Sequence, residues 1–142
     1  MYRHILVALE NAPPDEPIIA HVRSLAGSCG AKLTLVHVAD GFVARHGEQL
    51  NLAASPEMIK DRQYLDDVQQ RLVGEGVETD AALLFGEPTK EILDAASSRG
   101  CDLIAMGIHG HRWLADVVLG SVADAVRHRA TVPVLMIPTQ KK

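Results

Sequence analysis

The chain has 142 residues, which suits one domain built around one hydrophobic core. Its formal net charge is −4 and it lacks an extended basic cluster, which argues against nucleic acid as a partner because nucleic-acid-binding proteins usually present a basic face. No run approaches the roughly 20 apolar residues of a membrane-spanning helix, and the first residues do not form a signal peptide, so we expect a cytoplasmic protein without membrane contact.

Five short runs rich in apolar and β-branched residues predict strands that are covered on both faces. In chain order they are His4–Glu10 (HILVALE), Lys32–Val38 (KLTLVHV), Val77–Phe85 (VETDAALLF), Cys101–Gly107 (CDLIAMG) and Val132–Pro138 (VPVLMIP). The third run alternates more than the others, which predicts one preferred face for its larger side chains.

Helix signals separate these runs: prolines at first-turn positions, apolar residues at helical spacing, and glycines after the last turn. The predicted helices cover Pro17 to about Ser28, Ser55 to Gly74, Pro88 to Arg99, and Ser121 to about Arg129. Strict alternation of strand and helix predicts a single α/β domain over residues 1–142, with an open, mainly parallel sheet and helices on both faces.

The stretch Ala39–Ala54 (ADGFVARHGEQLNLAA) has no clean periodicity and is longer than a usual connection. Two interpretations remain open for it: a surface excursion with a short helical turn, or a mobile lid over a site.

In an open α/β sheet, ligands bind at the carboxyl ends of the strands, where the strand order reverses. The sequence places four segments there: Leu9–Asn11, Val38–Gly41, Gly86–Pro88 and Met106–Gly110. We therefore expect the ligand site among these residues.

Glycines mark the segment GIHGHRWLADVVLGS, which runs from Gly107 to Ser121. Gly107 and Gly110 allow backbone N–H groups to form a concave nest for anionic oxygens. Gly120 and Ser121 precede a predicted helix, whose first N–H groups lack intrahelical partners and carry partial positive charge. The spacing Gly-x2-Gly-x9-Gly-Ser therefore predicts that two sets of amides converge on phosphate groups. The motifs of the P-loop and of dinucleotide-binding folds are absent from the sequence.

With these motifs in place, the chain resembles the nucleotide-binding branch of the universal stress protein family along essentially its whole length. The resemblance rests on ILVAL at the start, LTLVHV, GEP after the third strand, DLIAMGIHG, LGSVADAV and the terminal PVLMIP. It implies a five-stranded parallel sheet of order 3-2-1-4-5, binding of ATP or AMP, and a homodimer formed by antiparallel pairing of the last strand, here Val132–Ile137.

The resemblance also implies which residues bind the nucleotide. Ala8, Leu9 and Glu10 would line the adenine and ribose region, and Val38 would contact adenine through its backbone. The remaining implied binding residues lie toward the phosphates: Met106, Gly107, His109, Gly110, Gly120, Ser121 and Val122.

Three residues depart from the family pattern. Glu10 stands where the family usually has Asp, and its side chain is one methylene longer. Ile108 replaces a frequent Ser or Thr and removes a hydroxyl donor near the phosphates. His111 stands where many relatives carry Arg, although Arg112 follows it. These departures bear on affinity and on the preferred number of phosphates.

The function predicted from the sequence is adenine-nucleotide binding by a regulatory, stress-response sensor with little or no catalysis. No catalytic residue is assigned, because no recognisable motif fixes a Lys or Arg in the phosphate loop. Asp116 and Glu10 are the only nearby carboxylates that could serve as a base or as Mg²⁺ partners with ATP. No resident metal is expected, because His109 and His111 lack a third ligand. The alternatives are a weak Mg²⁺-dependent ATP hydrolase on the same fold and a dimeric adaptor that uses no ligand.

Overall fold

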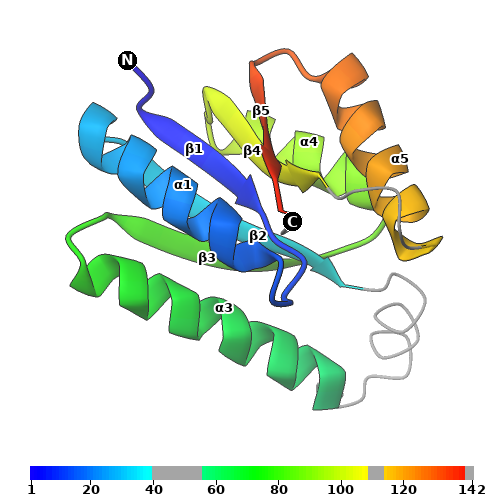
Figure 1. Ribbon diagram of the computed structural model, residues 1–142, viewed down its shortest axis with the longest axis horizontal. Helices are drawn as coiled ribbons and strands as arrows, with labels where there is room; N and C mark the ends of the chain where they lie inside the picture. The colour runs from blue at the N-terminus through cyan, green and yellow to red at the C-terminus, as the bar shows by residue number, and fades with distance from the viewer. Residues whose placement is uncertain (40–55, 109–113, 140–142) are drawn as a thin grey trace.

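The computed structural model describes residues 1–39, 56–108 and 114–139. Within these ranges, parallel strands form one sheet in the order β3-β2-β1-β4-β5 (Figure 1). This arrangement confirms the predicted order 3-2-1-4-5 and the single α/β architecture. The strands are β1 (His4–Ala8), β2 (Lys32–Ala39), β3 (Thr79–Phe85), β4 (Leu103–Ile108) and β5 (Val134–Pro138).

The helices follow the strands in strict alternation. They are α1 (Asp15–Cys29), α3 (Pro56–Gly74), α4 (Pro88–Ser98) and α5 (Leu114–Arg129). The start of α4 follows from its sequence, because the Glu87 carboxylate accepts the N–H groups of Thr89 and Lys90 while Pro88 occupies the first turn. Among the described helices, none has the length and apolar character needed to cross a bilayer.

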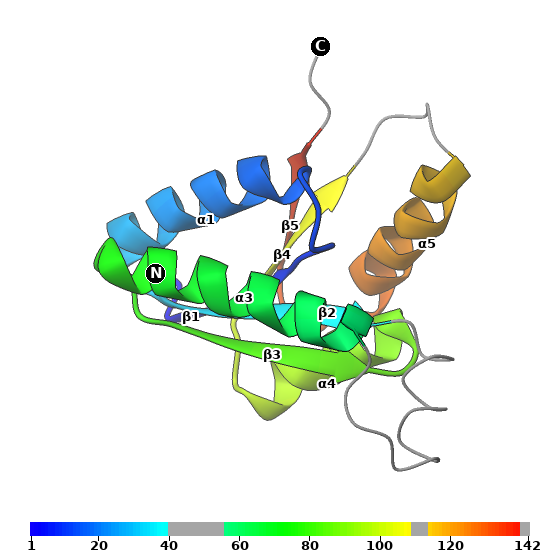
Figure 2. The same cartoon turned by 90° about the horizontal axis from the view of Figure 1, so that it is seen from below.

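Two helices cover each face of the sheet (Figure 2). On one face, α1 and α3 pack against the side chains of Ile5 and Val7, and on the other, α4 and α5 pack against Leu6. The central strand β1 is therefore enclosed, and the side chains of Ile5, Leu6 and Val7 are fully buried. Burial on both faces explains why the sequence shows a continuous apolar run there instead of alternation.

Helix α5 begins earlier than the sequence predicts. The prediction placed its first residue at Ser121, whereas the helix starts at Leu114, so Gly120 and Ser121 lie well inside it. The error came from treating Gly120 as a boundary, although an isolated glycine inside a helix costs only about 1 kcal/mol relative to alanine. The residues before it, LADVVL, support a helix strongly enough to offset that cost.

Candidate functional site

A cavity of about 250 Å³ opens at the carboxyl end of the sheet, where β1, β2 and β4 finish. This is the point at which the strand order reverses, because β1 pairs with β2 on one side and with β4 on the other. The predicted site residues that line the cavity are Ala8, Leu9, Glu10, Val38, Met106, Gly107 and Val122. The structure therefore brings together segments from both halves of the chain at the place expected from the fold.

The other predicted site residues divide into two pairs. His109 and Gly110 lie outside the described residues. Gly120 and Ser121 lie within α5, so the structure does not place their amides in the helix's first turn. Beyond the first turn of an α-helix, each N–H is bonded to a carbonyl one turn earlier and is not free to hold a phosphate.

Four further lining residues escaped the sequence-based assignment: Val36, His37, Pro88 and Ile92. Val36 shares the cavity face of β2 with Val38, as strand periodicity could have indicated. Pro88 falls in a segment already placed at the carboxyl edge, and Ile92 is one turn further along α4. His37 is a half-buried residue with a hydrogen bond, as its strand position suggests, and it also reaches the cavity wall.

The turn that follows β1 is held by Asp15, the first residue of α1. The buried carboxylate of Asp15 accepts the backbone N–H groups of Glu10, Asn11 and Ala12, at 2.9, 2.8 and 3.3 Å. Burial raises the pKa of the Asp15 carboxyl, and hydrogen bonds from the Glu10 amide and the Tyr64 hydroxyl offset part of that effect. The amides of the first β–α turn are thus bonded within the protein.

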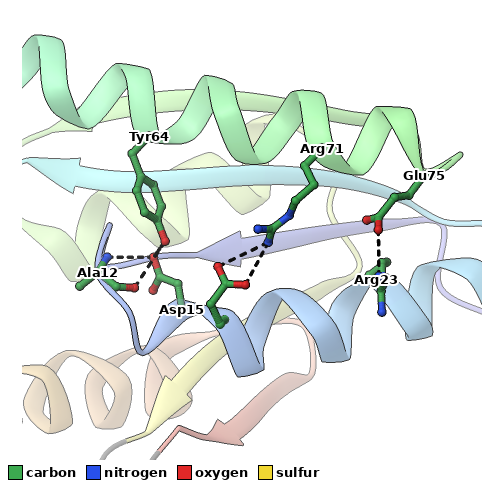
Figure 3. A network of polar contacts seen from close by, with 7 residues as sticks. Ala12, Asp15, Arg23, Tyr64, Arg71 and Glu75 are labelled. Carbon is green, nitrogen blue, oxygen red and sulfur yellow. Dashed lines mark hydrogen bonds and ion pairs between the residues drawn. The ribbon is translucent and has the colours of Figure 1, made fainter.

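Helix α3 reaches the same turn through Tyr64 (Figure 3). The Tyr64 hydroxyl donates to Asp15 Oδ2 at 2.9 Å, and burial together with the adjacent Asp15 raises the pKa of this phenol. Tyr64 therefore stays a protonated donor at neutral pH. Two ion pairs join α1 and α3 further along, Arg71 with Glu16 and Arg23 with Glu75, but their side chains are largely exposed and contribute little to stability.

Gly107 has a packing role that the sequence did not indicate. It lies in β4, its φ is outside the left-handed region, and a Cβ at this position would stand 2.7 Å from Ile18 Cδ1 and 2.8 Å from Thr139 Cγ2. The glycine thus lets α1 and the chain after β5 approach the strand on the face opposite α4 and α5. Close packing thus accounts for the glycine at this residue, and the amide nest with Gly110 stays a prediction.

The described lining residues give the cavity its chemical character. Most are apolar, Glu10 is the one carboxylate, and no lysine or arginine is among them. Within the described ranges, no group of three or more His, Cys, Asp or Glu side chains has a geometry that could hold a metal ion. The wall near β1 and β2 therefore suits an apolar ring and hydroxyl donors, and it offers no side-chain cation to a phosphate.

The fold and this crevice define an α/β protein with an open, parallel five-stranded sheet and a cavity at its topological switch point. A sequence model of the universal stress protein family matches residues 1–138, so the chain belongs to that family.

Three solved structures illustrate the likeness. The universal stress protein MJ0577 of Methanocaldococcus jannaschii is 25% identical, with a TM-score of 0.81 over 100% of this chain and 99% of that one. A universal stress protein in complex with cAMP is 19% identical, with a TM-score of 0.73 over 98% of both chains. The universal stress protein from Archaeoglobus fulgidus in complex with dAMP is 24% identical, with a TM-score of 0.72 over 96% of this chain and 98% of that one.

Proposed function

We propose that this chain binds AMP or ATP in the crevice at the ends of β1, β2 and β4. It acts there as a nucleotide-sensing regulatory protein of the stress response, with little or no turnover. The observation that carries the proposal is the cavity itself, which joins Ala8, Glu10, Val38, Met106 and Val122 from distant parts of the sequence. A concave, mostly apolar site with a few polar groups, at a topological switch point, is the usual setting of a nucleotide site in this fold class.

The base and ribose occupy the β1–β2 side of the crevice. The ligands of two structural neighbours, cAMP and dAMP, share adenine and differ in sugar and phosphate, which makes the base the common element. In this chain, Val36, Val38 and Ile92 offer an apolar surface to a purine ring, and the Glu10 carboxylate accepts hydrogen bonds from ribose hydroxyls.

The phosphates lie on the β4–α5 side, against backbone amides of Gly107, His109, Gly110, Gly120 and Ser121. Two arguments support this side: the glycine spacing, and the fact that Asp15 already uses the amides of the other turn. Since α5 starts at Leu114, phosphate binding by the amides of Gly120 and Ser121 requires the first turns of α5 to open. With ATP, Mg²⁺ would enter together with the nucleotide and supply positive charge to its phosphates, and no resident metal is needed.

Slow or absent turnover follows from the charges at the site. Phosphoryl transfer needs positioned cations and a base, and the described lining offers no lysine or arginine. The alternative, a weak Mg²⁺-dependent ATP hydrolase, requires Glu10 or Asp116 to serve as base. Phosphate release faster than about 1 s⁻¹ would place the protein in the ordinary enzyme range and favour that alternative.

Calorimetric titration with AMP and ATP tests the proposal, with Ala8→Leu as the diagnostic variant. Ala8 is half-buried and lines the cavity, so a larger side chain fills the space of the base and should weaken binding roughly tenfold or more. Ala20→Leu makes the same change at an exposed position on α1 and should leave affinity unchanged. Equal affinity of Ala8→Leu and wild type for AMP would overturn the proposed site.

The assembly proposed for the protein is a cytoplasmic homodimer paired along β5. Strand β5 is an edge of the sheet, with Val134, Leu135 and Met136 half-buried, and its outer edge is the natural place for an added strand. Light scattering at micromolar concentration should give the mass of a dimer, and a monomer mass would contradict the pairing.

The two cysteines are free, as suits the proposed reducing compartment. Burial raises the pKa of the Cys101 thiol to about 11, so this thiol stays unreactive.

A further inference from the structure

The peptide group between Leu9 and Glu10 is fixed at both of its polar ends. Its carbonyl accepts a hydrogen bond from Nδ1 of His37 at 2.8 Å, and its N–H donates to Asp15 Oδ1 at 2.9 Å. Rotation of this peptide would break both bonds at once. Because Glu10 lines the cavity, these two bonds also fix the direction in which its side chain leaves the backbone.

The ring of His37 also faces Asp61, a residue of α3. A carbonyl oxygen only accepts hydrogen bonds, so the contact with Leu9 requires the proton on Nδ1. The other nitrogen, Nε2, then faces Asp61 Oδ2 at 3.8 Å, with side-chain exposures of 17% for His37 and 27% for Asp61. The Asp61 carboxylate therefore lies beside the edge of the ring opposite the Leu9 contact.

Asn11 links the same aspartate to the turn by a second route. Its backbone has a positive φ of 60°, a conformation that asparagine tolerates better than most residues. Its side-chain Nδ2 donates to the backbone oxygen of Asp61 at 3.0 Å and to Oδ1 of Asp61 at 3.3 Å. The buried Oδ1 of Asn11 has no hydrogen-bond partner in the described structure, which means that the donors to Asp61 set the orientation of this amide.

We propose that Asp61 is a positioning residue for nucleotide binding, acting through His37 and Asn11. Asp61 lies outside the cavity lining, so its effect on a ligand passes through the Leu9–Asn11 turn that it holds. The contact that should depend on Asp61 is the one between Glu10 and the ribose hydroxyls, because the turn sets the direction of the Glu10 side chain. This inference rests on the proposed nucleotide site and extends it to α3, whose placement then influences the affinity of the crevice.

The test compares Asp61→Ala with Asp67→Ala, titrating each with AMP and with 2′-deoxy-AMP. Asp67 is an exposed aspartate of the same helix that accepts a hydrogen bond from Gln63 at 2.8 Å and lies outside the cavity lining, so it is a matched control. Asp61→Ala should weaken AMP binding roughly tenfold or more and 2′-deoxy-AMP binding several-fold less, because the latter lacks one of the hydroxyls that Glu10 would bind. Asp67→Ala should change neither affinity. An equal loss for both nucleotides, or no loss for either, would overturn the positioning role.

A second measurement needs no nucleotide. In ligand-free wild type, ¹⁵N NMR of the imidazole of His37 should show a protonated Nδ1, and the Glu10 amide should exchange slowly with solvent. In Asp61→Ala, the ¹⁵N signals of His37 should shift because the carboxylate beside Nε2 is gone, and the Glu10 amide should exchange faster, whereas Asp67→Ala should resemble wild type. Unchanged His37 and Glu10 signals in Asp61→Ala would overturn the inference. If wild type binds neither nucleotide, the proposed function fails, and these signals still decide whether Asp61 holds the turn.

Discussion

The two sides of the crevice are built by different means. On the β1 side, the side chains of Asp15 in α1 and His37 in β2 hydrogen-bond to the backbone of the turn. The side chain of Asn11, in the turn, donates to the backbone oxygen and Oδ1 of Asp61 in α3. On the β4 side, the last strand residues are fixed by close packing at Gly107 and by Thr139, which donates its N–H and its hydroxyl to the Ile108 carbonyl at 3.0 Å each.

The proposed nucleotide makes different demands on the two sides. A base and a ribose need fixed walls and a few directed acceptors, which side-chain-to-backbone hydrogen bonds provide. A phosphate group needs several N–H donors at close range, which glycine-containing backbone provides best. Variants that alter one side of the crevice at a time show whether the other side responds.

The largest expected effect belongs to Asp15→Ala. The substitution leaves the amides of Glu10, Asn11 and Ala12 without the buried carboxylate that accepts them. It also removes the shorter of the two hydrogen bonds of the Tyr64 hydroxyl. We expect a loss of about 3 kcal/mol or more in the free energy of unfolding, measured by urea denaturation.

Its control is Asp94→Ala, which removes an exposed ion pair with Lys90 and should change stability by about 0.5 kcal/mol or less. Similar losses for the two variants would show that the β1 turn does not depend on Asp15. If enough Asp15→Ala remains folded for titration, its AMP affinity should fall, since the wall of the base site has lost its main support.

The next effect is that of Gly107→Ala on the β4 side. The new Cβ would overlap Ile18 Cδ1 and Thr139 Cγ2, and such overpacking typically costs about 1–3 kcal/mol. Combining it with Ile18→Val, which deletes the overlapping methyl group, should recover part of that loss in a double-mutant cycle. Additive losses would show that Ile18 does not press on Gly107. Full stability of Gly107→Ala would show that its glycine serves the ligand and not the fold.

The residues changed in these variants also show which parts of the structure could be predicted from the sequence. The order of strands and helices could be predicted because parallel β–α units combine buried apolar runs with strong proline and glycine boundaries. Leu9, Val38 and Met106 could be placed at the site because carboxyl ends of parallel strands meet at one edge. Asp15, by contrast, looks in the sequence like an ordinary acidic residue at a helix start, and its role depends on the turn folding back over it.

Hydrogen bonds between residues far apart in the sequence could not be predicted for the same reason. Asn11 and Asp61 are 50 residues apart, and no local pattern connects an asparagine after a strand to an aspartate on a distant helix. The start of α5 could not be predicted because a glycine followed by a serine is compatible with both a helix boundary and a helix interior.

A smaller effect separates these two states of α5. If the amides of Gly120 and Ser121 hold phosphate only when the first turns open, the helical form competes with binding. Gly120→Ala should then raise the stability of the helix and weaken AMP binding, by up to about fivefold, because alanine exceeds glycine in helix propensity by about 1 kcal/mol. Ala115→Gly should do the reverse and strengthen AMP binding by a similar factor or less. Calorimetry with adenosine is the control, since a ligand without phosphate should respond to neither variant. Weaker AMP binding by Ala115→Gly would exclude the opening of α5.

The smallest effect concerns pH and compares the two ends of the central strands. Asp15, at the carboxyl end, has a pKa above the ordinary 3.8 because of burial, so its contribution to stability is present below pH 3.8 and is lost as pH rises through the raised pKa. Asp102, at the amino end, is also subject to burial, which acts to raise its pKa. Hydrogen bonds from the Arg3 and His4 amides outweigh that effect and lower the pKa of Asp102 below 3.8. The contribution of Asp102 to stability is therefore present above pH 3.8 and is lost on acidification.

Relative to wild type, Asp15→Asn should therefore gain stability as pH rises, whereas Asp102→Asn should lose it. Urea denaturation from pH 2.5 to 7 gives both difference curves. Parallel curves would mean that the two carboxylates experience the same balance of burial and hydrogen bonding, which would contradict the contrast between a deeply buried turn and a half-buried strand start.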